Sequence, residues 1–516
     1  MGDIHVSVAR ALVDAGARKA FTVASAHNVD LLDALLAEGV DIVPSRCELT
    51  AGHAADGYAR TSGEPTLLVT STGPGAGNAV GAIATAAKDC SDVIHVTTSN
   101  EVGLGQAVHT VPEQAGWHRA FDAPLVDVGG EDLDRLVDVL RARTGVMTVV
   151  VPFRADRRRP LRYAVPCVVP SDTRNVIGDV SPWLRSNRRL LLIGGGARKL
   201  GREVLLELVE RSGAAVVTTT QGKDLFPSDH SQFLGCTLQS QHTRNLAAQA
   251  EVCLAIGSRI TDLSTGTWGS PFPPLLLRVA ESSERPDWPS VVIRDVGTDI
   301  GLTLDGVLAA LPQGAPPVFG TEIGAQAAGH QRSTDRSGAE YSVIDAVCRG
   351  LDKGDTLVCD MTKLSFWVLT AGKIPTGARF LWPGLLSMGF GLPAGVGASH
   401  ASPRGHVVVL VGDGGLLSVL PALEDAVRVP GRLSIVLIDD NGYGILRPKA
   451  SREVATGLCS FAGPRWSEIA DAFGLSYVDV GDPSDLAAKL ASPGADVRLL
   501  RVDGDNLAIE HNWMEA

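Results

Sequence analysis

The stretch from residue 407 to residue 446 limits the fold of this chain more than any other. It begins with the β-branched run Val407 to Val411, which predicts a buried strand ending at the turn Gly412-Asp413-Gly414-Gly415. A mostly apolar helical stretch follows to about Val427, and the apolar run Leu433 to Ile438 predicts a second buried strand. The pattern is that of a βαβ unit, so we expect a parallel α/β sheet.

Acidic residues follow both of these strands. Asp413 comes after the first strand, and Asp440 comes shortly after the second. Because neighbouring parallel strands end at the same edge of a sheet, we expect both carboxylates to converge on one hard cation. Mg²⁺ is usually held by a few protein oxygens and keeps other positions free for phosphate. Gly-Asp-Gly also makes ordinary turns, so this tripeptide alone does not distinguish a metal site from a turn.

The whole unit resembles the diphosphate-binding motif of enzymes that depend on thiamine diphosphate (ThDP). In that family GDG opens the motif and an Asn-Asn pair closes it, and the spacing of 27 positions from Asp413 to Asp440 suits the family. The resemblance implies Mg²⁺ ligands at Asp413, Asp440 and the carbonyl of Gly442. It also implies ThDP contacts at Gly412, Gly414, Gly415, Tyr443 and Ile445. Here Asp439-Asp440 replaces the Asn-Asn pair, which keeps an oxygen ligand and adds negative charge.

The bulk composition excludes several classes of partner. The chain has 516 residues, of which 45% are hydrophobic and 20% charged, with a net charge of −12. This length suggests about three domains, and the acidic balance argues against nucleic acid or an anionic membrane as a partner. The eight cysteines lack CxxC or metal-ligand spacing, which is typical of reduced thiols in a cytoplasmic protein. We expect neither a secretory signal nor a membrane-spanning segment.

A helix is expected to begin near Glu48, within a first region of alternating helix and strand patterns. Taken alone, Glu48 is more typical of a surface glutamate that the helix dipole favours in the first turn. However, the stretch RCELTAGHAADGYAR (46–60) resembles the ThDP-family segment whose glutamate contacts the aminopyrimidine ring. The resemblance implies that Glu48 is catalytic.

Two further segments resemble parts of ThDP enzymes. Residues 71–97 contain STGPGAGN, which is similar to the family's GPG-x-x-N segment and implies cofactor contacts at Gly73, Pro74 and Asn78. Residues 382–398 resemble the segment that packs beneath the cofactor, which implies contacts at Ser387 and Met388. Met388 would be the apolar wedge that keeps ThDP bent, and the alternative is a methionine in the hydrophobic core.

The resemblance covers essentially the whole chain and predicts three doubly wound parallel-sheet α/β domains. They are a pyrimidine-binding domain (1–165), a central domain (176–315) and a diphosphate-binding domain (335–516). Proline- and arginine-rich residues 153–175 and residues 312–340 are expected to be linkers. The family's cofactor lies between the first domain of one subunit and the last domain of another, which implies at least a homodimer, with a homotetramer expected.

The central domain raises a separate question of nucleotide binding. A predicted strand at 189–193 precedes Gly194-Gly195-Gly196, but the GxGxxG form is absent. In some family members this domain binds FAD or ADP, and in others it is only scaffold. We expect scaffold here.

The resemblance implies decarboxylation of a 2-oxo acid to an enamine, which is then protonated or added to an acceptor carbonyl. Ala26, Val108 and Leu446 stand where pyruvate-decarboxylase relatives carry protonating groups, whereas His109 is retained. His27 could also act as an acid or base. Loss of the protonating groups favours an acetolactate-synthase-like carboligase.

Other functions remain open at this point. They are a simple decarboxylase that releases an aldehyde, an inactive ThDP-binding subunit, and a nucleotide-binding α/β protein that uses its GDG and GGG turns as phosphate loops. The intact Glu48 and metal motif argue against the inactive subunit.

Overall fold

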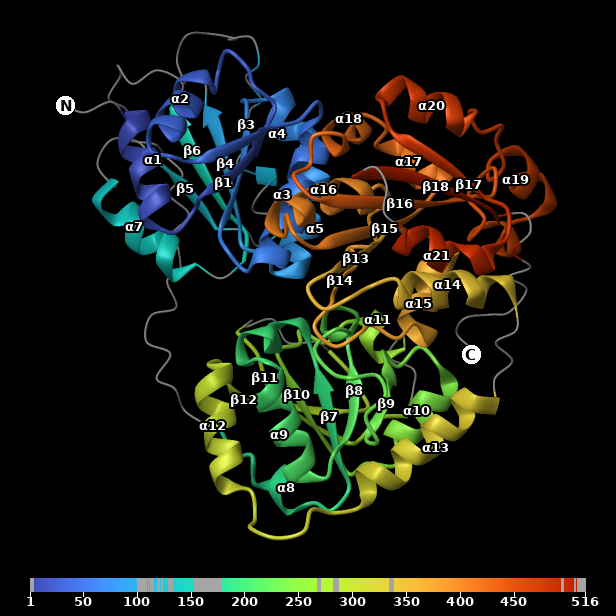
Figure 1. Ribbon diagram of the computed structural model, residues 1–516. Coiled ribbons are helices and arrows are strands. Elements are labelled where there is room, and N and C mark those ends of the chain that lie inside the picture. The colour runs from blue at the N-terminus through green and yellow to red at the C-terminus, as the bar shows by residue number, and fades with distance from the viewer. Residues whose placement is uncertain are drawn as a thin grey trace.

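The structure, a computed structural model, contains three parallel sheets of six strands each, which follow one another along the chain and are flanked by helices (Figure 1). It describes residues 4–99, 109, 111, 116–117, 121, 124–128, 133–143, 145–152, 178–266, 271–281, 287–333, 338–492, 496–504 and 507, with only the backbone for 133–135 and 332–333. The expected fold of three α/β domains is confirmed. Among the described helices, none has the length and apolar character needed to cross a membrane.

The sheet of the first domain has the strand order β2-β1-β3-β4-β6-β5. Its strands are β1 (Lys19–Thr22), β2 (Asp41–Pro44), β3 (Thr66–Thr70), β4 (Val93–Ser99), β5 (Leu125–Asp127) and β6 (Met147–Pro152). Its helices are α1 (Ile4–Asp14), α2 (Val29–Ala37), α3 (Glu48–Ser62), α4 (Pro74–Asn78), α5 (Val80–Asp89) and α7 (Leu133–Ala142).

The sheet of the central domain has the order β12-β11-β10-β7-β8-β9. Its strands are β7 (Arg189–Ile193), β8 (Ala215–Thr218), β9 (Phe233–Cys236), β10 (Val252–Ile256), β11 (Leu275–Val279) and β12 (Val292–Gly297). The helices are α8 (Ser181–Arg185), α9 (Arg202–Ser212), α10 (Gln241–Ala247), α11 (Asp262–Thr265), α12 (Ile300–Ala310) and α13 (Phe319–Ser333), with 3₁₀ helices η1 (Gly195–Leu200) and η2 (Thr220–Gly222).

The sheet of the third domain has the order β14-β13-β15-β16-β18-β17. Its strands are β13 (Thr356–Cys359), β14 (Arg379–Leu381), β15 (His406–Gly412), β16 (Arg432–Asp439), β17 (Ser476–Val480) and β18 (Val497–Asp503). The helices are α14 (Ala339–Arg349), α15 (Lys363–Ala371), α16 (Gly391–Ala401), α17 (Asp413–Ser418), α18 (Ala422–Ala426), α19 (Arg452–Gly457), α20 (Trp466–Phe473) and α21 (Leu486–Ala491), with 3₁₀ helices η3 (Arg447–Lys449) and η4 (Pro483–Asp485).

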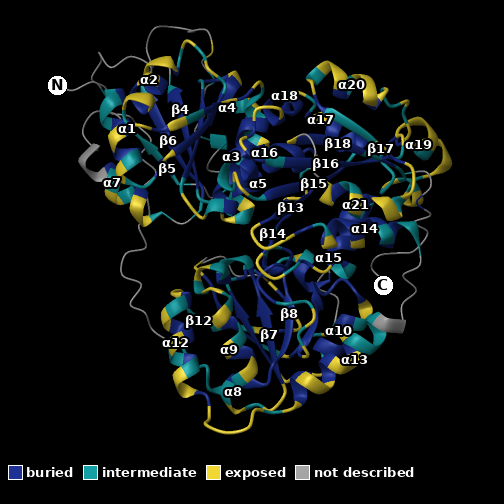
Figure 2. Ribbon diagram, viewed as in Figure 1, coloured by how far each residue is buried: buried dark blue, intermediate teal, exposed yellow. Residues whose placement is uncertain are grey.

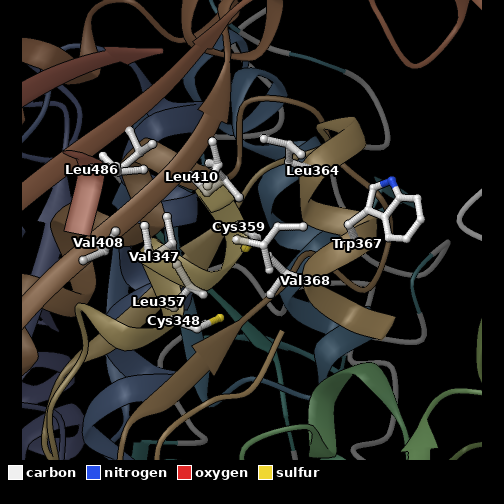
Figure 3. Packing of buried hydrophobic residues seen from close by; sticks show 14 of the residues in the cluster. Val347, Cys348, Leu357, Cys359, Leu364, Trp367, Val368, Val408, Leu410 and Leu486 are labelled. Carbon is white, nitrogen blue, oxygen red and sulfur yellow. The ribbon is translucent and has the colours of Figure 1, made fainter. Parts of the chain in front are cut away.

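Both faces of the third sheet are covered, as the continuous apolar runs predict. Successive side chains of a strand point to opposite faces. Accordingly, Val408 and Leu410 of β15 join one hydrophobic cluster, whereas Val407, Val409 and Val411 join another. Figure 3 shows the first cluster, in which Val408 and Leu410 lie near side chains of α14 and α15. In all three domains the strands are largely buried and the exposed residues gather on the outer helices and loops (Figure 2).

Helices α3 and α16 join the first domain to the third through a close backbone approach. A Cβ built on Gly397 would lie 1.9 Å from the carbonyl oxygen of Ala54, and one built on Gly57 would lie 2.1 Å from that of Ala394. Only glycine lacks the atom that would collide at these two positions. The two helices therefore pack with their backbones in contact.

A buried polar junction links all three domains. The Asp89 carboxylate accepts hydrogen bonds from Arg60 (3.0 Å), from the Gln221 side chain (2.8 Å) and from the Gly384 backbone (3.0 Å). Arg60 and Gln221 also donate to the carbonyl oxygen of Trp382, at 3.0 and 2.9 Å. These contacts hold the segment that leads to Ser387 and Met388 against the first and central domains.

The sequence predicted two linkers, and the structure describes only one of these two regions. The predicted linker 312–340 contains α13, which packs on the central sheet through Phe319, Ile323 and Ala327. Their spacing of four places them on one helix face, a period hidden by the many small and polar residues around them. The predicted linker 153–175 lies outside the described residues.

Candidate active site

Asp413 and Asp440 follow the carboxyl ends of two adjacent strands, as predicted. Gly412, the last residue of β15, pairs with Ile438 of β16, so both strands end at the same level. Asp413 then begins α17, and Asp440 comes directly after β16. The parallel register therefore brings the two carboxylates to one edge of the sheet.

The Asp413 carboxylate is fully buried and joins the two halves of the motif. Its Oδ1 accepts a hydrogen bond from the Gly414 backbone (2.7 Å), and its Oδ2 accepts one from the Gly442 backbone (2.9 Å). Burial raises the pKa of Asp413 to about 6, and the charge of Asp440 adds to the rise. Two carboxylates in this setting create a negative potential that a divalent cation would offset.

The donor set fits a hard cation better than a soft one. Asp413, Asp440 and the Gly442 carbonyl offer only oxygen atoms, which suits Mg²⁺. Within the part of the chain that the structure describes, no group of three or more His, Cys, Asp or Glu side chains is arranged to hold a metal. With two carboxylates and one carbonyl, such a cation would keep positions for phosphate oxygens.

The glycines of the motif allow close approach of its parts. A Cβ on Gly414 would lie 2.5 Å from the Tyr443 ring, and one on Gly415 would lie 3.1 Å from Asp360 Oδ1. Gly412 is the N-cap of α17, and Ile445 packs against a buried cluster of the third domain. These residues, all predicted to contact the cofactor, lie in or beside the two segments that carry Asp413 and Asp440.

The loop before α16 is anchored by Asp360, a residue that the sequence reasoning missed. Its carboxylate is fully buried and accepts hydrogen bonds from the backbones of Met361 (2.6 Å), Gly389 (3.0 Å) and Gly391 (2.6 Å). Burial raises the pKa of Asp360, and the three N–H donors act against this rise. Asp360 directly follows β13, so the signal that identified Asp413 could also have found it.

Met388 and Ser387 lie on this anchored loop. Met388 is 43% exposed in the single chain, so it is not part of a hydrophobic core there. The Ser387 hydroxyl lies 2.6 Å from that of Thr85 in α5. The wedge role of Met388 stays a prediction.

The first domain gathers the remaining predicted residues around the start of α3. Glu48 is the first residue of α3, and its Oε2 accepts a hydrogen bond of 3.0 Å from Asn78 at the end of α4. A Cβ on Gly75 would lie 2.4 Å from Ser71 Oγ and 3.0 Å from Glu48 Oε1, so Gly75 packs closely beside that carboxylate. Asn78 thus orients the Glu48 carboxylate, and the catalytic role of Glu48 stays a prediction. Pro74 is the first residue of α4 and directly follows Gly73.

His109 lies beside this group. A Cβ on Gly73, whose φ is 63°, would lie 2.2 Å from the His109 carbonyl oxygen. The rings of His109 and His27 meet edge to face, with 5.0 Å between centroids. Burial lowers the pKa of His27, and the nearby His109 lowers it further. Val108, the other position compared with pyruvate decarboxylases, lies outside the described residues.

Within one chain the two groups of residues face different ends of the third sheet. The Arg428 side chain, four residues before β16 begins, donates to the Pro44 carbonyl at the end of β2 (2.8 Å). Ser45 and Arg46 likewise contact Asp425 and Glu424 of α18. Asp440 lies past the opposite end of β16, whose eight residues span roughly 25 Å. In Figure 1, α19, which follows the Asp440 loop, lies on the side of the third domain away from the first domain.

Comparison with known proteins identifies the family. Models of thiamine pyrophosphate enzymes match three parts of the chain: the N-terminal TPP binding domain at residues 4–119, the central domain at 183–288 and the C-terminal TPP binding domain at 360–494. The chain belongs to the thiamine pyrophosphate enzyme family. Thiamine pyrophosphate is another name for ThDP, and the two matched binding domains contain the two groups of site residues.

Three relatives of the ThDP enzyme match most of its length. A probable 2-ketoarginine decarboxylase of Pseudomonas aeruginosa is 27% identical, covering 86% of this chain and 82% of the relative. The large subunit of acetolactate synthase isozyme 1 of Escherichia coli is 25% identical, covering 89% and 87%. An alpha-keto-acid decarboxylase of Mycolicibacterium paratuberculosis is 24% identical, covering 90% and 86%. The chain is thus a ThDP-dependent enzyme of the group that includes acetolactate synthases and 2-oxo acid decarboxylases.

In this ThDP enzyme, the glycine triplet of the central domain is explained by packing. Cβ atoms on Gly194 and Gly196 would lie 2.3 and 3.1 Å from the Gly257 carbonyl oxygen, and one on Gly195 would lie 2.8 Å from the Gln221 Cβ. The triplet therefore serves close contact between parts of the chain, which needs no bound phosphate.

Proposed function

We propose that this enzyme uses ThDP and Mg²⁺ to decarboxylate a 2-oxo acid and to transfer the acyl unit to an acceptor carbonyl. The observation that carries this carboligase proposal is the apolar character of positions that could otherwise protonate the intermediate. Leu446, six residues after Asp440, is 48% exposed, and Ala26, next to His27 in the sequence, is also exposed. With few acidic groups at these positions, addition to an acceptor carbonyl can compete with protonation of the acyl unit.

In this proposal Glu48 positions the aminopyrimidine ring of ThDP and exchanges a proton with it. Asn78 holds Oε2, and Oε1 would accept a hydrogen bond from a ring nitrogen. ThDP, when bound, would accept the electron pair released with CO₂ and carry the acyl unit. His109, whose backbone lies against Gly73, would orient the acceptor or donate a proton to its oxygen.

Mg²⁺ and the diphosphate would be held at the third sheet. Asp413, Asp440 and the carbonyl of Gly442 would hold the cation, and the diphosphate would bind beside the turn at 412–415. The exposed apolar side chain of Met388 would support the rings of the cofactor.

We further propose that each active site is built from two subunits, so that a homodimer is the smallest active form and a homotetramer is expected. The support is the separation within one chain, where residues next to Glu48 contact α18 near the start of β16 while Asp440 lies past its other end. A second subunit in a twofold arrangement would supply the missing half.

Mixing two inactive variants tests the shared site. Subunits with Glu48→Gln and subunits with Asp413→Ala should regain up to about a quarter of wild-type activity when coexpressed, because half of the mixed dimers' sites would be intact. No recovery in isolated mixed dimers would show that each chain holds a complete site.

Product analysis tests the reaction. We expect CO₂ release from the matching 2-oxo acid to increase when an aldehyde or a second 2-oxo acid is supplied, with a ligated hydroxy ketone or 2-hydroxy-2-acyl acid found by mass spectrometry. His109→Ala should reduce ligation more than it reduces the first CO₂ release. His230→Ala, in the central domain, is the matched control and should change neither.

A second candidate function is simple decarboxylation with release of an aldehyde. Two of the relatives carry names of decarboxylases, which favours this alternative. Free aldehyde formed at full rate, without ligated product for any acceptor, would replace the carboligase proposal with this one.

A further inference from the structure

The edge of the third sheet where we propose that Mg²⁺ binds carries three carboxylates, one more than the two proposed as ligands. Asp413, Asp439 and Asp440 all lie there. The Asp439 side chain is 7% exposed, and its Oδ2 accepts a hydrogen bond from Arg501 Nε at 2.6 Å. Arg501 comes from the neighbouring strand β18 and offsets the charge of Asp439 within the sheet. A different cation must therefore offset the negative charge of Asp440.

Arg447 lies directly against the loop of Asp440. Its Nη2 donates to the backbone carbonyl of Asp440 and lies 4.0 Å from the Asp440 carboxylate. A Cβ on Gly442 would lie 2.8 Å from the same nitrogen. The guanidinium therefore touches both loop residues that are proposed to bind the cation.

The loop has other supports for its shape. The backbones of Phe461 and Asn441 are joined by a hydrogen bond of 3.0 Å, and those of Tyr443 and Cys459 by one of 2.8 Å. Gly442 also forms an antiparallel bridge with Ser460. Because these bonds hold the backbone, we expect the charge of Arg447 to matter more than its contribution to shape.

The position of Arg447 also places it beside open space. A hollow of about 500 Å³ is lined by Asp440, Asn441, Arg447, Ser460, Phe461 and Ala462. Lys363, at the start of α15, is a second cation near Asp440; burial lowers the pKa of Lys363 and Asp440 acts against this shift. Arg447 contacts the loop directly, through its hydrogen bond to the Asp440 carbonyl.

We propose that Arg447 is a positioning residue that acts as the counter-charge of Asp440, so that a carboxylate can serve at this metal position while an anionic diphosphate is bound. The inference rests on the proposed Mg²⁺–ThDP site. With Asp439 paired to Arg501, the negative charges of Asp413 and Asp440 remain at the site, and Arg447 and Lys363 are cations near Asp440. Removing Arg447 leaves a more negative edge that repels diphosphate. With asparagine at position 440 the counter-charge becomes unnecessary.

A double-mutant cycle tests this inference. We would measure ThDP binding by titration calorimetry at saturating Mg²⁺ for the wild type, Arg447→Gln, Asp440→Asn and the double variant. Arg447→Gln should raise the dissociation constant about tenfold, which corresponds to about 1.4 kcal/mol. In the Asp440→Asn background the same substitution should raise it less than about twofold, since the partner charge is gone.

Two further variants separate charge from shape. Arg447→Lys keeps the charge but loses the planar fork, and it should bind ThDP within about threefold of the wild type. Arg465→Gln removes an exposed arginine that pairs with Glu468 at 2.8 Å, and it should leave binding unchanged. Circular dichroism shows whether each variant is folded.

Several results would overturn the proposal. One is an equal loss of ThDP affinity from Arg447→Gln in the wild-type and Asp440→Asn backgrounds. Another is no loss of affinity from Arg447→Gln. A third is an Arg447→Lys variant that binds ThDP as weakly as Arg447→Gln. If the glutamine variant does not fold, the lysine variant decides alone. A wild-type protein that fails to bind ThDP with Mg²⁺ would refute the proposed function as well, whereas binding with an additive cycle would refute only the role of Arg447.

Discussion

Replacing Gly397 by alanine should weaken the contact that joins the first domain to the third. The added Cβ would lie 1.9 Å from the Ala54 carbonyl oxygen and 2.8 Å from the Tyr58 nitrogen. An ordinary contact needs about 3.4 Å, so α3 and α16 would have to separate by about 1.5 Å. Overpacking of this kind costs about 1–3 kcal/mol or more. The higher helix propensity of alanine returns at most about 1 kcal/mol.

Because the clash is with backbone atoms, we take the upper end of this range, and the net loss in the free energy of unfolding of Gly397→Ala is about 2 kcal/mol. For a cooperative unit of about 200 residues this lowers the melting temperature by about 4–8 °C, measured by scanning calorimetry. Gly301→Ala in α12 is the matched control, because its Cβ would meet only Asp299 Oδ1, at 3.5 Å. The control should leave the melting temperature unchanged or slightly higher. A Gly397→Ala protein as stable as the control would refute the close packing of α3 on α16.

Three further predictions concern the site. Asp413→Ala should abolish ThDP binding, measured by calorimetry with Mg²⁺, and unchanged affinity would contradict the metal assignment. Asp440→Asn keeps an oxygen ligand and should bind ThDP within about tenfold of the wild type. Because burial and Asp440 raise the pKa of Asp413 to about 6, protons compete with the cation below that pH. The apparent ThDP dissociation constant should then rise about tenfold per pH unit below about pH 6 and be flat above about pH 7, and a constant that instead rises toward high pH would disprove this competition. Glu48→Gln should keep the fold and bind ThDP, but its turnover should fall roughly 10²-fold or more. Equal rates of hydrogen–deuterium exchange at C2 of bound ThDP in the wild type and in Glu48→Gln would show that Glu48 is not catalytic.

Local patterns were sufficient to predict the parallel α/β fold class and the position of Asp413 and Asp440 at one edge of the third sheet. Apolar runs at 407–411 and 433–438 became β15 and β16 because buried parallel strands need side chains that are apolar on both faces. Asp413 and Asp440 could be placed together because adjacent parallel strands end at one edge, and the register bears this out. The catalytic role expected for Glu48 followed from resemblance and not from any local rule, and its hydrogen bond to Asn78 was found only in the structure.

Other features depend on contacts that no local pattern contains. The helix α13 was missed because the residues that it buries on the central sheet, Phe319, Ile323 and Ala327, stand among small and polar neighbours in the sequence. The pairing of Asp439 with Arg501 joins residues 62 positions apart, so the sequence showed an extra charge without its partner.

The sequence by itself determined which side chains can do the chemistry, and the tertiary structure decided which of them meet. Glu48 and Asp440 are both present in every chain, yet the packing of α3 on α16 and of Pro44 on Arg428 directs them to different ends of the third sheet. The physical reason is that strand and helix periodicity act over a few residues, whereas the relative placement of domains depends on buried backbone contacts such as Gly397 against Ala54, between segments that are far apart along the chain.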